Sequence, residues 1–213
     1  MANNTTDTPP QPENEAANKT NKINENKSEL IRKLIHFLIA LAPLMASIHR
    51  LFTLIFLLTG TVVYTIFEIF RLKGIKIPLV STLTNYASRP RDKGHFVLGP
   101  VTLGLGAFFS ILLFSLPAAS VAIYALAFGD GFAGLAGKIF GRHKPKFLFG
   151  KSIEGSLTCF AAVFLSSYLV LKNVKIALFA ALTAMLIESL PLGDFDNLVL
   201  PLLTGLVVQV LMA

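Results

Sequence analysis

The sequence predicts an all-α protein, a polytopic transmembrane helix bundle of about seven spans with a cytoplasmic N-terminus. Three observations lead to this prediction: the apolar composition, the alternation of apolar runs with short polar breaks, and the uneven placement of basic residues. Of the 213 residues, 54% are hydrophobic and 15% are charged, whereas soluble domains carry about 25% charged residues. We therefore assign the formal net charge of +7 to membrane topology and expect no nucleic-acid partner.

Two regions differ in composition. Residues 1–28 are rich in Asn, Thr, Glu, Lys and Pro and hold almost nothing that could pack into a core, so we expect a disordered polar tail. Residues 29–213 are predicted to form a single transmembrane domain. The single cysteine, Cys159, stands among apolar residues, which argues against a disulfide framework and against a thiolate metal site.

The second region contains a series of apolar runs that we predict to be helices. Several are shorter than the roughly 20 residues that a span requires, so the helices are expected to extend into polar flanks where Arg and Lys side chains reach the interface. The fourth run is expected to continue through Gly129 and Asp130 towards Phe140. The runs cover residues 34–48, 51–67, 96–116, 118–128, 157–171, 174–187 and 198–213.

Basic residues predict the orientation. With seven spans and a cytoplasmic N-terminus, all 19 Lys and Arg residues except Arg50, Lys172 and Lys175 fall on the cytoplasmic side, as the positive-inside rule requires. The same arrangement places all 12 Asp and Glu residues there, although acidic residues contribute little to orientation. Long cytoplasmic loops would account for many of them. They do not account for Asp130, Glu154 and Glu188, which lie within or against apolar runs, and such carboxylates are candidates for a functional site.

Two basic clusters have more than one interpretation. In Arg32-Lys33-x-x-His36 the first and last side chains share one helical face and could hold a phosphate, or the cluster could be a plain membrane anchor. The loop Arg89-Pro-Arg91-Asp-Lys-Gly-His95 suits phosphate capture by a tight loop, but ordinary cytoplasmic loops have the same composition.

A glycine-rich segment carries the sharpest signal. Small residues recur there every four positions and predict a seam for close helix contact. Packing alone does not explain Asp130 beside this seam, or Lys138 on a similar face. We therefore expect a ligand to approach the helix backbone here, with Asp130 available to hold a divalent cation. The seam residues are Gly129, Ala133, Gly137 and Gly141.

Two further segments suggest phosphate and magnesium chemistry. Gly150-Lys151-Ser152 is not a P-loop, because residue 145 is Pro where the leading glycine is required and no strand precedes it. A lysine next to a helix N-terminus nevertheless suits a phosphate. The carboxylates of Glu188, Asp194 and Asp196, predicted on the same membrane face, suit the accompanying Mg²⁺.

These motifs resemble the CTP-dependent lipid-alcohol kinases, a group with dolichol, phytol and farnesol kinases and the fungal CTP-dependent diacylglycerol kinase. The resemblance runs in order from residue 29 to about residue 200. It is carried by Arg32-Lys33-Leu-Ile-His36, Gly129-Asp130-x-x-Ala133-x-x-x-Gly137-x-x-x-Gly141, Lys151-Ser152-x-Glu154-Gly155 and Glu188…Asp196-Asn197.

The resemblance implies a catalytic domain that transfers the γ-phosphoryl group of CTP to the hydroxyl of a membrane lipid, with Mg²⁺ as cofactor. The acceptor could be a polyprenol, a shorter isoprenoid alcohol or diacylglycerol. The implied catalytic residues are Asp130, Glu154, Arg32 and Lys33; the nucleotide-binding residues are Gly129, Ala133, Gly137, Lys138, Gly141, Lys151, Ser152, Gly155, Arg89 and Arg91; the metal ligands are Asp130, Glu188, Asp194 and Asp196.

Two alternatives stay open. The family is similar to the phosphatidate cytidylyltransferases, which also use CTP and magnesium but make a CDP-lipid; this sequence lacks their longer C-terminal signature. A transporter without enzymatic activity is the other alternative, and the absence of mid-span charges argues against it. The protein is expected in a cell inner membrane or an ER-type membrane, with the active site facing the cytoplasm.

Overall fold

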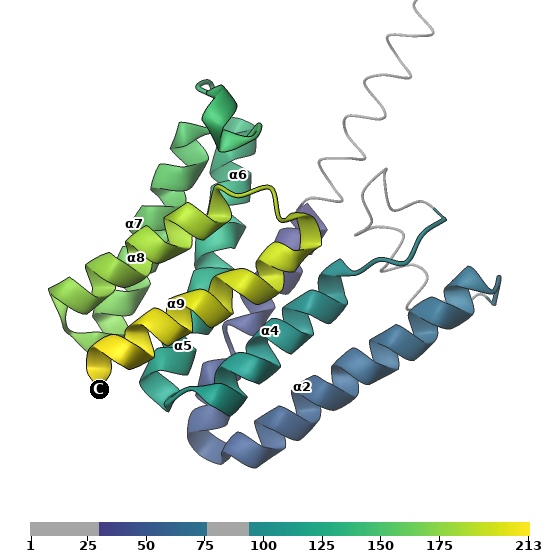
Figure 1. Cartoon of the computed structure of the whole chain (residues 1–213). Coiled ribbons are helices and arrows are strands. Elements are labelled where there is room, and N and C mark those ends of the chain that lie inside the picture. Colours follow the sequence, from purple (N-terminus) through teal and green to yellow (C-terminus); the bar gives the residue numbers. More distant parts are fainter. Residues whose placement is uncertain (1–29, 76–93) are drawn as a thin grey trace, which may run out of the picture.

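The computed structural model describes residues 30–75 and 94–213, and every regular element in these two ranges is helical. The all-α prediction is confirmed for this part of the chain (Figure 1). The predicted tail, and Arg89 and Arg91 in the basic loop, lie outside the described residues. After a helical stretch at residues 30–39, the helices are α2 (Ala42–Leu72), α4 (Gly99–Leu113), α5 (Leu116–Tyr124), the π-helix η2 (Ala125–Asp130), α6 (Gly131–Ile139), α7 (Ile153–Leu171), α8 (Val174–Glu188) and α9 (Asp196–Met212), with 3-10 turns η3 (Lys146–Leu148) and η4 (Gly193–Phe195).

The first two apolar runs form two helical segments that meet at His49. This residue has non-helical dihedral angles (φ −150°, ψ 93°) in the middle of α2, and the chain reverses its direction there (Figure 1). The part of α2 before His49 follows the helical stretch 30–39 after a turn at residues 40–41. The break between the runs 34–48 and 51–67 is thereby confirmed.

Within residues 30–75 and 94–213, four helical stretches are long and apolar enough to cross a membrane: α2, which is 31 residues long including the break at His49, Leu116–Ile139 with 24, α7 with 19 and Gly193–Met212 with 20. Helices α4 and α8 have 15 residues each, or about 22 Å at 1.5 Å per residue. That length is below the hydrocarbon thickness of about 30 Å. The structure thus supports a membrane protein, while seven spans and a cytoplasmic N-terminus stay predictions. The expected continuation of the fourth run through Gly129 and Asp130 is confirmed, because α5, η2 and α6 follow each other without a break.

Small side chains fill the interior and large apolar side chains cover the outside. On α8, four alanines at helical spacing are fully buried: Ala177, Ala180, Ala181 and Ala184. The outer face of α2 instead exposes Leu51, Phe52, Ile55 and Phe56, each by more than half. Close packing of small residues drives helix association in a bilayer, where large apolar side chains can face lipid without penalty.

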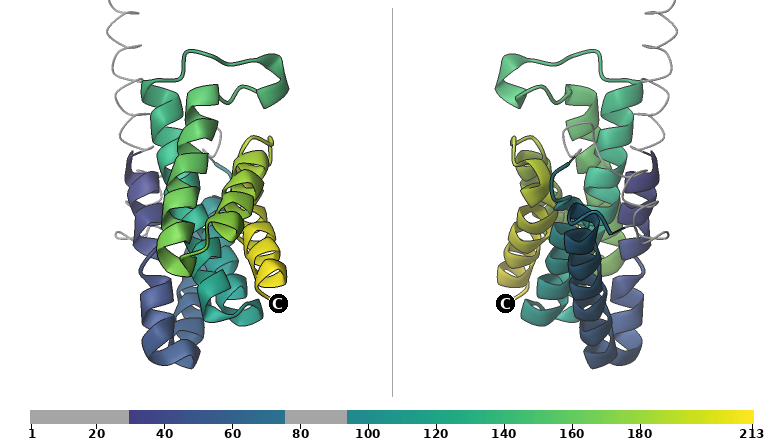
Figure 2. Two further views of the ribbon diagram at one scale, coloured as in Figure 1. Left: turned by 90° about the vertical axis from the view of Figure 1, so that its left-hand side faces the viewer. Right: turned by 90° about the vertical axis from the view of Figure 1, so that its right-hand side faces the viewer.

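The polar helix ends gather on one side of the bundle. The ends of α6 and α8 and the starts of α7 and α9 all lie in the upper half of Figure 2, whereas the marked C-terminus and the blue turn within α2 lie below. Residues that are far apart in the sequence therefore meet at one end of the bundle.

Candidate active site

The π-helix η2 ends at Asp130 in the middle of the stretch Leu116–Ile139. Short π-helical insertions widen one turn of a helix and occur frequently at functional sites. The Asp130 side chain is 13% exposed, so its carboxylate is largely shielded from solvent within an apolar helix.

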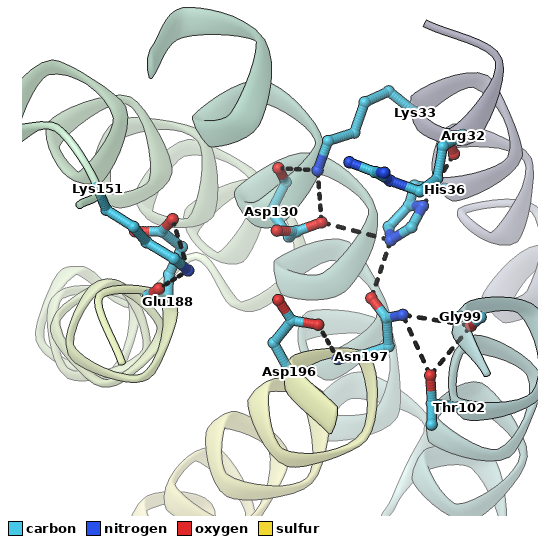
Figure 3. Close-up of polar contacts among 10 residues, drawn as sticks. All are labelled: Arg32, Lys33, His36, Gly99, Thr102, Asp130, Lys151, Glu188, Asp196 and Asn197. Carbon is cyan, nitrogen blue, oxygen red and sulfur yellow. Dashed lines mark hydrogen bonds and ion pairs between the residues drawn. The ribbon is translucent and has the colours of Figure 1, made fainter. Parts of the chain in front are cut away.

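Two side chains from the helical stretch 30–39 contact Asp130 (Figure 3). Lys33 donates from Nζ to Asp130 Oδ2 at 2.7 Å and to the Asp130 carbonyl oxygen at 2.9 Å. His36 Nε2 lies 3.3 Å from the same Oδ2 atom. Lys33 and His36 are each 4% exposed, so these contacts replace solvation that the buried groups have lost.

His36 in turn contacts the start of α9. Its Nε2 atom lies 2.9 Å from Asn197 Oδ1. Asn197 donates from Nδ2 to the Gly99 carbonyl and to Thr102 Oγ1 in α4, at 3.2 Å each. A continuous polar chain therefore runs from Asp130 to α4 (Figure 3).

The start of α7 supplies the other side of the site. Gly150 has a φ of +90°, a conformation that favours glycine, and it leads into the N-cap residue Ser152, whose hydroxyl accepts from the Gly155 backbone N–H at 3.1 Å. Lys151 lies 3.1 Å from Glu188 Oε1 and also donates to the Glu188 carbonyl oxygen. Ser156 donates to Glu188 Oε2 at 3.2 Å.

The predicted glycine seam is confirmed as a close helix contact. A Cβ atom at Gly129 would lie 2.7 Å from a methyl group of Val163, and one at Gly155 would lie 2.9 Å from the Ala133 carbonyl oxygen. Such distances are too short for a side chain, so glycine lets η2 and α6 approach the backbone of α7.

A cavity of about 300 Å³ opens between these elements. Five basic and three acidic side chains line it, together with small residues from α6 and the start of α7. The lining residues are Arg32, Lys33, Asp130, Ala133, Gly134, Gly137, Lys138, Lys144, Gly150, Lys151, Ser152, Gly155, Glu188 and Asp196.

Most of the predicted site residues meet at this cavity, and the structure adds Gly134, Lys144 and Gly150 to them. Four predicted residues are not part of its lining: Gly129, Gly141, Glu154 and Asp194. Gly129 and Gly141 make packing contacts, the latter against Ser152. Arg89 and Arg91 lie outside the described residues.

Glu154 holds a loop instead of facing the cavity. Its carboxylate accepts from the backbone N–H groups of Arg142 and His143 at 3.2 Å each and lies 2.7 Å from His143 Nδ1. The expectation of a catalytic Glu154 came from its place next to Lys151-Ser152, but the first turn of α7 directs it to the preceding loop.

Asn197 was not among the predicted site residues, and His36 was considered only as part of the basic cluster that could hold a phosphate. Both stand in the motifs quoted above, one helical turn after Arg32 and directly after Asp196. That adjacency was the available signal, but neither residue type by itself pointed to a contact with Asp130.

The acidic residues suit a magnesium ion that arrives with a phosphate ligand. Within residues 30–75 and 94–213, no three His, Cys, Asp or Glu side chains are grouped closely enough to hold a metal by themselves. Mg²⁺ in nucleotide sites is commonly held by one or two carboxylates plus phosphate oxygens and water. Asp130, Glu188 and Asp196 line the same cavity, so the residues present fit this arrangement.

Comparison with known proteins identifies relatives. No protein-family model matches the chain, and no solved structure gives a significant match. An uncharacterized protein of Methanocaldococcus jannaschii is 30% identical over 186 residues, which cover 85% of this chain and 93% of the relative. The phytol kinase of Synechocystis is 31% identical over 142 residues (62% of this chain, 59% of the kinase), and a probable chloroplastic phytol kinase of Oryza sativa is 29% identical over 157 residues (65% and 50%). The matches thus span 59% of one kinase and 50% of the other. Together with the ordered motifs around the cavity, these matches support the resemblance of the chain to the lipid-alcohol kinases.

Proposed function

We propose that this protein is a CTP-dependent kinase that phosphorylates the hydroxyl group of an isoprenoid alcohol in the membrane. The observation that carries the proposal is the cavity in which the nearly buried Asp130 and a set of basic side chains face the same space. The names of the matched phytol kinases support an isoprenoid alcohol as the acceptor.

The donor side of the cavity suits a triphosphate. Lys138, Lys144 and Lys151 line it beside the N-terminus of α7, where the helix dipole favours an anion. The small residues Gly134 and Gly137 let a bulky ligand approach the backbone of α6. Glu188 and Asp196 are the carboxylates that would hold Mg²⁺ with the phosphates, and bound Mg²⁺ neutralises the charge that develops during transfer.

The acceptor side suits an apolar chain. The Phe37 ring packs directly on Gly131, next to Asp130, since a Cβ atom at Gly131 would lie 2.7 Å from it. The Phe37 and Phe132 ring centroids are 4.9 Å apart, and those of Phe128 and Phe132 are 6.1 Å apart. An isoprenoid chain lying against these rings would bring its hydroxyl group to Asp130.

In the proposed reaction the alcohol oxygen attacks the γ-phosphorus of CTP. A new O–P bond forms, the bond between the γ-phosphorus and the β,γ-bridging oxygen breaks, and CDP leaves with that oxygen. Asp130 orients the hydroxyl group and accepts its proton, while Arg32 and Lys33 balance the negative charge. Such a reaction depends mainly on positioning and on charge stabilisation, which the cavity residues are arranged to provide.

The proposal is tested with the purified, detergent-solubilised full chain, γ-labelled CTP, Mg²⁺ and a panel of phytol, farnesol, a polyprenol and diacylglycerol. We expect a labelled phosphomonoester of an isoprenoid alcohol and CDP, at a rate at least tenfold higher with CTP than with ATP or GTP. Release of pyrophosphate with formation of a CDP-lipid from phosphatidate would instead support the cytidylyltransferase alternative. No transfer to any alcohol in the panel would refute the proposed function.

A further inference from the structure

The two carboxylate oxygens of Asp130 have different surroundings. Oδ2 is within 2.7 Å of Lys33 Nζ and 3.3 Å of His36 Nε2. Oδ1 makes no hydrogen bond within the described ranges 30–75 and 94–213, and it points away from Lys33 and His36 (Figure 3). Since Asp130 lines the cavity, one oxygen is held by the protein and the other is available to a ligand.

His36 is itself held in place. Its Nδ1 atom lies 2.9 Å from the Arg32 carbonyl oxygen, and its Nε2 atom lies 2.9 Å from Asn197 Oδ1. Contacts at both ring nitrogens fix the orientation of the imidazole plane, so Nε2 is held pointing towards Asp130.

The orientation of Asn197 follows from its contacts with α4. The Gly99 carbonyl oxygen can only accept a hydrogen bond, so the NH2 group of the Asn197 side chain (Nδ2) must face it. The side-chain oxygen Oδ1 must then face His36. The close approach of α4 and α9 makes this contact possible, because a Cβ atom at Gly106 would overlap the Asn197 carbonyl oxygen. Asn197 is 5% exposed, so the packing of the two helices determines its position.

We infer that His36 and Asn197 are positioning residues that hold Oδ2 of Asp130 and thereby direct Oδ1 into the cavity. The catalytic consequence rests on the proposed kinase function, in which Oδ1 meets the acceptor hydroxyl. A carboxylate that is already oriented loses less rotational freedom when the reaction begins, and supporting contacts of this kind hold a reactive group within a few tenths of an ångström.

The kinetic test uses His36→Ala and Asn197→Ala in the full-length protein. A misplacement of about 1 Å at a reacting group can cost about 100-fold in rate, so we expect a loss of kcat of roughly that size, with the KM for CTP changed less than twofold. His36→Gln keeps an amide donor near the position of Nε2 and should recover part of the activity that His36→Ala loses. A kcat within twofold of wild type per folded molecule in both alanine variants would overturn the inference.

Matched controls lie at the other end of the bundle. His49→Ala removes an exposed histidine whose Nδ1 accepts from the Phe52 backbone N–H at 3.1 Å. Asn173→Ala removes an asparagine that caps α8 through the Lys175 backbone N–H at 3.0 Å. Both controls should keep the wild-type kcat, and an equal loss of kcat in them would also contradict a specific role of His36 and Asn197.

A second measurement is independent of the reaction. His36→Ala and Asn197→Ala should each lower the melting temperature in detergent, and the double variant should lower it by clearly less than the sum, because the two residues belong to one chain of contacts. Fully additive shifts would overturn the inference even in an active enzyme. A wild-type protein without kinase activity would refute the proposed function, and the melting temperatures would then decide whether His36 and Asn197 act together on Asp130.

Discussion

Lys33 and Asp130 are separated by 97 positions in the chain, yet their side chains form a buried ion pair with 2.7 Å between Nζ and Oδ2. Their side chains are 5% and 13% exposed. The pair joins the first described helical stretch to the central helix of the bundle, so it has consequences for both stability and activity.

Lys33→Met should destabilise the protein strongly. Breaking a buried pair by removing one partner costs about 3–5 kcal/mol, because the remaining charge is left uncompensated. Combining it with Asp130→Asn removes that charge, so the double variant should be more stable than Lys33→Met alone but inactive. Thermal unfolding in detergent measures both, and a Lys33→Met protein as stable as the wild type would contradict the pair's structural role.

Asp130→Asn should lower turnover by about 10²- to 10⁴-fold, the usual contribution of a positioned general base. The amide keeps the shape of the side chain and can still accept from Lys33, so the yield of folded protein should change little. If Asp130 acts on the hydroxyl, the magnesium concentration at half-maximal rate should stay as in the wild type. A clearly higher magnesium requirement would show that Asp130 is a metal ligand instead, and wild-type turnover would exclude both roles.

Lys151→Met should weaken nucleotide binding. A hydrogen bond to a charged group contributes about 1.5–3 kcal/mol, so the KM for CTP should rise roughly 10- to 100-fold. The KM for the alcohol should stay the same. Lys175→Met at the start of α8 is the matched control, since Lys175 is not part of the cavity lining; equal effects of the two variants would argue against phosphate binding by Lys151.

Phe132→Ala should weaken binding of the alcohol and leave CTP binding unchanged. Loss of the apolar contact area of one aromatic ring predicts a roughly tenfold higher KM for a long isoprenoid alcohol. Tyr168→Ala is a close control, because Tyr168 also ends a stack of rings spaced four residues apart and is 38% exposed, compared with 43% for Phe132. If both substitutions raised the KM equally, the surface next to Asp130 would not be the acceptor site.

The predicted topology requires the two ends of the chain on opposite sides of the membrane. A reporter fused to the N-terminus should be cytoplasmic, and one fused after Ala213 should be outside, because only three of the 19 basic residues are then external. Reporters found on the same side would mean an even number of spans, and the assignment of the cavity to the cytoplasmic face would have to be abandoned.

The helical class, the apolar runs and the choice of Asp130 as a candidate site residue could be derived from the sequence. Hydropathy is a property of neighbouring residues, so a run such as 157–171 indicates a helix wherever it packs. A carboxylate next to glycines in an apolar helix is costly in any bundle, which made Asp130 recognisable. The lysines at positions 138 and 151 followed from the same local reasoning.

The contacts among the site residues depended on which helices become neighbours. Lys33 was expected to bind phosphate, and its pairing with Asp130 follows from the packing of residues 30–39 beside the π-helix. Glu154 contacts His143 in the loop before α7 and does not line the cavity. This could be recognised only from the position of that loop in the folded protein.

The contacts of Glu68 are a second example of what the sequence alone did not reveal. It is a fully buried carboxylate at the end of α2, held by Arg71 at 2.6 Å and by the Val97 backbone N–H at 2.9 Å. The sequence placed it no differently from the other carboxylates that are predicted to be cytoplasmic. Hydropathy adds up contributions along the chain, whereas ion pairs and hydrogen bonds depend on distances between segments that are remote in sequence. Only the packed bundle therefore brings Lys33, His36 and Asn197 close to Asp130. The same packing brings the Val97 backbone N–H to Glu68.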